Sequence, residues 1–118
     1  MPPRDWPLRV HDILDQIALV KAHTAGADQA RFALDSLLQG DAMYRIGIIG
    51  EAVAGIPDEV KASHPEVPWR VIRNMRNVLT HVYFQVDIDR VWQVIETDLD
   101  VLRVQMEALL IAEGHALP

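Results

Sequence analysis

The sequence has no cysteine among its 118 residues, which excludes disulfide bridges, thiolate zinc sites and cysteine nucleophiles. Only 6% of the residues are aromatic although half are hydrophobic, so we expect an aliphatic core and not a disordered chain. No apolar run approaches the roughly 20 residues of a membrane span, and the N-terminal "MPPRDWPLRVHD" lacks the apolar segment of a signal peptide. We therefore expect one domain, residues 1–118, in a cytoplasmic protein with no membrane contact.

Lysine is also scarce, since Lys21 and Lys61 are the only two lysines and the net charge is -6. An acidic balance argues against an extended nucleic-acid surface, because phosphate contacts need positive charge. It leaves room for a small local site built from arginines, which can hold a phosphate through two hydrogen bonds. The five histidines are scattered and form no H-E-x-x-H or E-x-x-H pair, so no metal site is expected.

The apolar spacing is helical almost throughout, and no convincing pair of strands is present. A first helix is expected from a cap at Asp5 to Gly26, a short one from Asp28 through Phe32, and a third from about residue 36 to 54. A turn-rich connection with at most one helical turn follows. Pro68 suits the first turn of a fourth helix, 68–81, and Asp87 or Asp89 starts a long last helix. The expected fold is all-α, an up-and-down bundle of four main helices plus a short one.

Four apolar stripes are expected to form the core of this bundle. The first helix contributes Val10, Ile13, Leu14, Ile17, Ala18 and Val20, and the third contributes Leu37, Leu38, Tyr44, Ile48, Ile49 and Val53. The fourth contributes Val71, Met75 and Val78, flanked by Ile72 and Leu79. The last contributes Val91, Val94, Ile95, Leu99, Leu102, Met106, Leu109 and Leu110.

The stretch "RNVLTHVY", residues 76–83, places chemically capable side chains at the end of the fourth helix. Arg76 falls at the border of the predicted core face, and Arg70, Arg73, Asn74 and Asn77 lie on the opposite face. His81 follows Arg76 by five residues, about 140° around a regular helix, so the two would not meet within one helix. Either the helix unwinds near Thr80, or two copies of the chain share one site.

Ordinary structural roles are open for the same residues. His81 could cap a helix end, where its charge would favour the dipole. Arg76 could pair with Glu51 of the third helix, and Tyr83 could be a core aromatic residue with a satisfied hydroxyl.

Arg76, His81 and Tyr83 fill an R-x-x-x-x-H-x-Y pattern that resembles the signature of the HepT-like toxins of the HEPN superfamily. The flanking "PWRVIRNMRNVLTHVYFQVDIDRVW", the preceding "IIGEAVAGIP" and the early "HDILDQIALV" resemble the corresponding segments of that family. The resemblance spans nearly the whole chain.

This resemblance implies a metal-independent endoribonuclease without a cofactor, the toxin of a type VII toxin–antitoxin system. It implies Arg76 and His81 as catalytic residues and a homodimer as the assembly. The antitoxin would be an MntA-type nucleotidyltransferase that transfers AMP from ATP to Tyr83, and the substrate would be RNA.

The chemistry is consistent with these residue types. RNA supplies its own nucleophile, the 2′-hydroxyl, and a histidine can move protons near neutral pH. Arginine supplies fixed positive charge where the phosphorane develops. Asn77, Arg73 and Arg70 are candidates for supporting RNA contacts. The alternative is a non-catalytic helical subunit that docks a minimal nucleotidyltransferase and presents a substrate to it.

Overall fold

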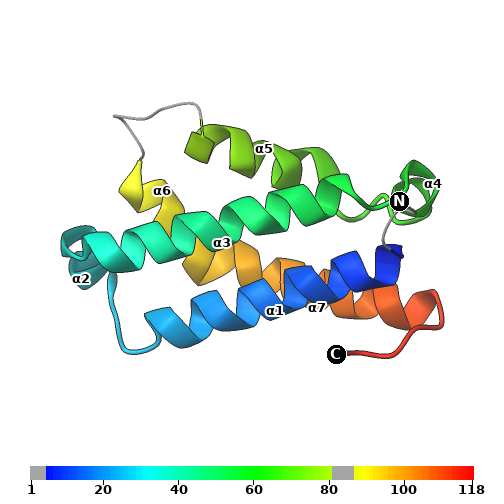
Figure 1. Cartoon of the computed structure of the whole chain (residues 1–118), viewed down its shortest axis with the longest axis horizontal. Helices are drawn as coiled ribbons and strands as arrows, with labels where there is room; N and C mark the ends of the chain where they lie inside the picture. Colours follow the sequence, from blue (N-terminus) through cyan, green and yellow to red (C-terminus); the bar gives the residue numbers. More distant parts are fainter. Residues whose placement is uncertain (1–4, 81–86) are drawn as a thin grey trace.

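A computed structural model describes residues 5–80 and 87–118, with side chains for 5–74 and 87–118. Every regular element within these residues is a helix (Figure 1). In chain order they are α1 (Trp6–Thr24), α2 (Gln29–Leu34), α3 (Ser36–Ala54), α4 (Asp58–Ser63), α5 (Trp69–Thr80), α6 (Ile88–Gln93), the π-helical segment η1 (Val94–Asp98) and α7 (Leu99–Ala112). The all-α prediction is confirmed, with α4 as a second short helix in the turn-rich connection.

The helix α3 lies between α1 and α5, and α6, η1 and α7 follow one another behind it (Figure 1). α1 packs against both α3 and α7, and α5 packs against α3. The short helices α2 and α4 lie at opposite ends of the bundle. As a result, α5 is a peripheral helix, and at its start Ile72 is buried whereas Arg70, Val71, Arg73 and Asn74 are exposed.

The core contains the apolar stripes of α1, α3 and the last helical segment. Every predicted core residue of the last segment is buried, from Val91 to Leu110, and α1 buries five of its six predicted residues. The sixth, Ala18, is exposed because it lies about 100° around the helix from Ile17, at the edge of the buried stripe.

The predicted core face of α3 was partly wrong. Leu37 and Tyr44 are 86% and 68% exposed, whereas Ala42 and Ile46 are almost fully buried. Apolar residues occur on nearly every side of α3, so hydrophobic spacing does not select a single face. The three glycines within it do not break the helix, which is continuous from Ser36 to Ala54.

The predicted core face of α5 also needs a correction. Val71, which was expected at the centre of the core face, is 54% exposed. Ile72, which was expected only to flank that face, is 2% exposed and therefore belongs to the core. The other members of that predicted face, Met75, Val78 and Leu79, have side chains outside the described residues.

Aspartates cap three of the helices. The carboxylates of Asp28, Asp35 and Asp87 accept hydrogen bonds from the backbone N–H groups three residues on, at 2.8, 3.0 and 3.1 Å. Each such cap stabilises a helix by about 1 kcal/mol. Asp5 precedes α1, but its side chain makes no capping hydrogen bond, contrary to the prediction.

The last helical segment contains a π-helical turn that the sequence did not predict. At its end the N–H of Leu99 donates to the carbonyl of Val94, five residues back. The ammonium of Lys21 donates to the carbonyl of Ile95 at 3.0 Å and to the carboxylate of Asp100 at 3.3 Å. Lys21 thus joins α1 to the widened turn.

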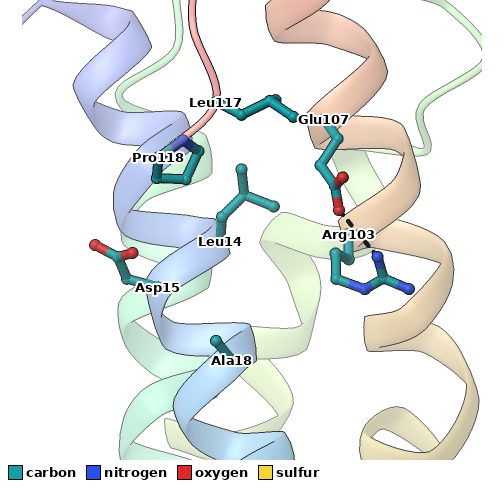
Figure 2. Close-up of a pocket in the computed structure, with 7 residues that line it drawn as sticks. All are labelled: Leu14, Asp15, Ala18, Arg103, Glu107, Leu117 and Pro118. Atoms are coloured by element: carbon teal, nitrogen blue, oxygen red, sulfur yellow. Dashed lines mark hydrogen bonds and ion pairs between the residues drawn. The ribbon is translucent and has the colours of Figure 1, made fainter.

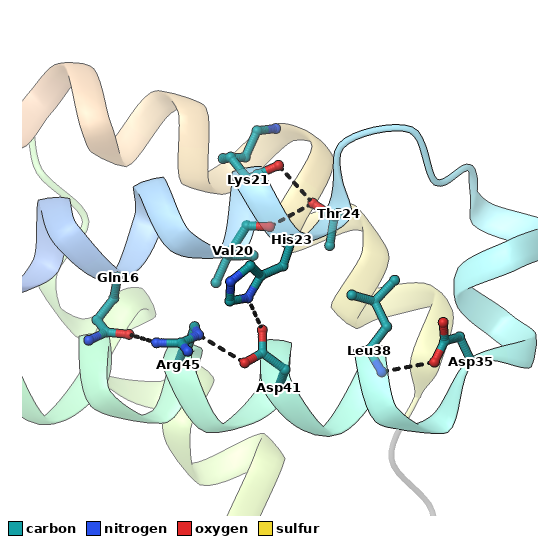
Figure 3. A network of polar contacts seen from close by, with 9 residues as sticks. All are labelled: Gln16, Val20, Lys21, His23, Thr24, Asp35, Leu38, Asp41 and Arg45. Carbon is teal, nitrogen blue, oxygen red and sulfur yellow. Dashed lines mark hydrogen bonds and ion pairs between the residues drawn. The ribbon is translucent and has the colours of Figure 1, made fainter.

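A polar network ties α1 to α3 (Figure 3). The carboxylate of Asp41 accepts hydrogen bonds from His23 Nδ1 at 2.7 Å and Arg45 Nε at 3.0 Å, and Arg45 also donates to Gln16 Oε1 at 3.0 Å. Burial alone would raise the pKa of the Asp41 carboxyl, but the hydrogen bonds from His23 and Arg45 outweigh it and lower that pKa below its ordinary value.

Asp41→Asn is expected to destabilise the fold at neutral pH, by about 1 kcal/mol because the network is partly exposed to solvent. A carboxyl whose pKa is lowered by folding contributes stability above its unfolded pKa and loses it as pH falls through the folded pKa. The difference in unfolding free energy between wild type and variant should therefore shrink toward acid. Urea unfolding at about pH 7 and about pH 3 measures it, and a difference that grows in acid would contradict the assignment.

Candidate functional site

The first turn of α5 is fixed to the preceding segment by Trp69. The indole Nε1 donates to the carbonyl oxygens of Lys61 and His64, at 3.1 and 3.0 Å. The carbonyl of Pro68 accepts the first helical hydrogen bond, from the N–H of Ile72 at 3.1 Å. These contacts set the position of α5 relative to α4.

An open hollow lies where these two helices meet. It has a volume of about 490 Å³ and is lined by Asp58 and Lys61 of α4 and by four residues of α5. The residues from α5 are Trp69, Arg70, Arg73 and Asn74. Three cations and one carboxylate therefore surround it, so this corner of an acidic protein carries positive charge.

The cations of the hollow differ from most others in the described part of the chain. Lys21, Arg45, Arg90 and Arg103 form ion pairs with carboxylates at 3.0–3.3 Å. In contrast, Lys61, Arg70 and Arg73 form no ion pair with a carboxylate among the described side chains. Their charges are available to an external anion.

The structure describes only some of the predicted site residues. Arg70 and Arg73 are exposed and line the same hollow, as supporting contacts for RNA would require. Arg76 and Asn77 belong to α5, but their side chains lie outside the described residues, and so do His81 and Tyr83. The convergence of Arg76 and His81 remains a prediction.

Four residues of the hollow were not among the predicted site residues, namely Asp58, Lys61, Trp69 and Asn74. Lys61 lies eight residues before Trp69, in a connection predicted to be turn-rich with at most one helical turn. The hydrogen bond from the Trp69 indole to the Lys61 carbonyl brings α4 beside the start of α5. Asp58, which also belongs to α4, lines the same hollow. The sequence pattern did not indicate that Lys61 lies beside the start of α5, because a single lysine in a turn-rich segment has no characteristic spacing to the next helix.

A second hollow, of about 360 Å³, lies between α1 and α7 (Figure 2). Leu117 and Pro118, at the end of the chain, lie against it beside Leu14. Its arginine, Arg103, is paired with Glu107 at 3.0 Å. This hollow is therefore a weaker candidate for an anion site than the one between α4 and α5.

Within the described residues, no group of three or more histidine, aspartate and glutamate side chains could hold a metal ion. None of the helices in that part of the chain is both long and apolar enough to cross a membrane.

The described residues form an all-α bundle, and the first turns of the helix at its edge carry the exposed Arg70 and Arg73. The sequence matches the family described as HepT-like (ribonuclease HepT-like) over residues 13–109, and the chain belongs to this family.

Several relatives are similar along most of their length. A "Probable ribonuclease HepT" from Thermococcus cleftensis is 35% identical over 100 residues, which are 85% of this chain and 91% of the relative. A protein from Caldanaerobacter subterraneus subsp. tengcongensis, named as a candidate RNase, is 32% identical over 101 residues, or 86% of this chain and 90% of the relative. No solved structure matches the chain.

Proposed function

We propose that the chain is a metal-independent endoribonuclease and the toxin of a type VII toxin–antitoxin pair. The observation that carries this proposal is the family match over residues 13–109, which includes Arg76, His81 and Tyr83 in their R-x-x-x-x-H-x-Y spacing. The names of the relatives also support an RNase. The unpaired cations at the start of α5 add local positive charge beside the proposed site.

In the proposed reaction the 2′-hydroxyl of RNA attacks the adjacent phosphorus and the bond from phosphorus to the 5′ oxygen breaks. The products are a 2′,3′-cyclic phosphate and a 5′-hydroxyl. His81 accepts the proton of the nucleophile or protonates the leaving oxygen, as an imidazole near neutral pH can do. The Arg76 guanidinium stabilises the negative charge that develops on the phosphorane.

A homodimer is part of the proposal, because two copies can supply both the acid and the base from two His81 side chains. On a continuous α-helix, Asn77 falls near the face that carries Arg70 and Arg73, since the spacings are seven and four residues. We propose that these three residues hold phosphates next to the one that is cleaved.

The reaction class is tested by incubating purified protein with defined RNA oligonucleotides in the presence of a chelator. We expect cleavage to persist with the chelator and to leave a cyclic phosphate. A 2′-deoxy substitution at the cut position should block it, because the nucleophile is missing. Cleavage that stops with chelator and returns with a divalent cation would contradict the proposal. If no RNA is cleaved but the chain still binds a nucleotidyltransferase, the non-catalytic subunit becomes the better assignment.

Tyr83 is the proposed point of inhibition. A nucleotidyltransferase partner of the MntA type would transfer AMP from ATP to the Tyr83 hydroxyl, which adds bulk and negative charge beside the site and repels an RNA phosphate. Mass spectrometry after incubation with the partner and ATP should show AMP-sized additions on Tyr83, together with loss of cleavage.

The matched control for this modification is Tyr44, which is 68% exposed on α3 and should remain unmodified. Tyr83→Phe should abolish the addition, whereas Tyr44→Phe should leave it unchanged. Equal modification of the Tyr83→Phe variant would refute the switch.

A further inference from the structure

We propose that the hollow between α4 and α5 is an RNA-backbone subsite, in which Lys61 joins Arg70 and Arg73 to bind phosphates flanking the scissile one. This inference rests on the proposed function for the identity of its ligand, and it adds a residue from a second helix to the proposed site. It also assigns Asp58 a role in limiting the affinity.

The cations approach the hollow from two elements. Arg70 and Arg73 are three residues apart on α5 and exposed, so they are neighbours on one face of that helix. Lys61 comes from α4 and lies on the opposite side of the turn that Trp69 closes. Unpaired cations on two elements can contact successive phosphates of one strand.

The position of the hollow along α5 favours RNA as the occupant. With a rise of about 1.5 Å per residue, Arg73 and Arg70 precede Arg76 by about 4.5 and 9 Å along the helix axis. An RNA strand bound at Arg76 can therefore reach both arginines with its neighbouring phosphates.

The remaining lining suits a single strand. Trp69 supplies an apolar wall whose position is fixed by two hydrogen bonds, and Asn74 supplies an amide. Aromatic walls beside a cationic groove are a common arrangement in proteins that bind single-stranded nucleic acid.

Replacing Asp58 should change RNA affinity in the opposite direction to replacing the cations, which gives a second test of the proposal. It is the one carboxylate that lines this hollow, and it is exposed. A negative charge there repels phosphates, so its removal should strengthen binding while removal of the cations weakens it. A merely structural role for these residues would not produce opposite effects.

The experiment measures binding of a fluorescent 2′-O-methyl RNA 12-mer to the full chain by anisotropy, with chelator present and at several salt concentrations. Such RNA lacks the nucleophile, so binding is measured without cleavage. Lys61→Gln and Arg70→Gln should each weaken binding about 3- to 10-fold at low salt and reduce the salt slope by about 0.7, the value for one phosphate contact on a single strand. Asp58→Asn should tighten binding by a similar factor.

Arg31→Gln is the matched control. Arg31 is an exposed arginine on α2, at the other end of the bundle, and its loss changes the net charge by the same amount (Figure 1). We expect the Arg31→Gln variant to bind the RNA 12-mer with an affinity within twofold of the wild type.

Three results would overturn the subsite. These are wild-type affinity in both Lys61→Gln and Arg70→Gln, an equal loss in Arg31→Gln, or no binding of the 12-mer by the wild type. Failure of the proposed function is distinguishable, since it would appear as absent cleavage of ordinary RNA while the binding pattern above is retained.

Discussion

Replacing His81 with alanine is expected to lower kcat for RNA cleavage by about 10²- to 10⁴-fold, the usual contribution of a positioned acid or base. KM should change little, because the imidazole moves protons in the transition state and binds little of the ground-state substrate. The remaining rate should lose the part of its pH dependence that comes from proton transfer by the His81 imidazole. Steady-state cleavage at several RNA concentrations across a pH series, with chelator present, measures kcat, KM and the pH dependence.

His11→Ala is the control for this substitution. His11 lies on α1, where its Nε2 is 3.0 Å from the carbonyl of Ala116, outside the segment that carries the motif. Its loss should leave kcat and the pH profile unchanged. If His81→Ala keeps the wild-type rate, or if His11→Ala falls equally, the catalytic role of His81 is wrong.

Replacing Phe32 with alanine is expected to reduce the free energy of unfolding by about 3–5 kcal/mol. The Phe32 side chain is completely buried, and its ring centroid lies 5.3 Å from that of Trp92 in α6. The contact joins the short helix α2 to α6, so a cavity there would remove packing from both elements. For a domain whose total stability is typically about 5–15 kcal/mol, the loss is a large fraction.

Leu34→Ala provides the matched comparison. Leu34 lies two residues further along α2 and is 89% exposed, so its truncation should change stability by less than about 0.5 kcal/mol. Urea unfolding followed by circular dichroism gives both values. A cost below about 1 kcal/mol for Phe32→Ala would show that α2 does not depend on this contact.

Sequence spacing predicted the last helical segment best, because its stripe from Val91 to Leu110 alternates with polar residues at helical period. It failed for Leu37 and Tyr44, because apolar residues occur on nearly every side of α3. There, contact with α1 and α5 decides which residues are buried, and those contacts cannot be obtained from the spacing within α3.

The candidate site shows the same limit. Arg70 and Arg73 were predicted to share a face of the fourth helix, because residues three apart on a helix are neighbours. Both are exposed. Lys61 could not be placed beside them, because its position depends on the indole of Trp69 closing the turn between α4 and α5. The π-helical turn at Val94–Asp98 likewise has a distant partner, because the carbonyl of Ile95 accepts a hydrogen bond from Lys21 of α1.

The most direct test is a crystal structure of the chain with an uncleavable 2′-O-methyl RNA. We predict that one phosphodiester will accept hydrogen bonds from the guanidinium of Arg76 and lie within hydrogen-bonding reach of His81, from one copy or from two copies of the chain. An RNA bound with those two side chains on separate phosphates, or with neither near the backbone, would contradict the proposed site.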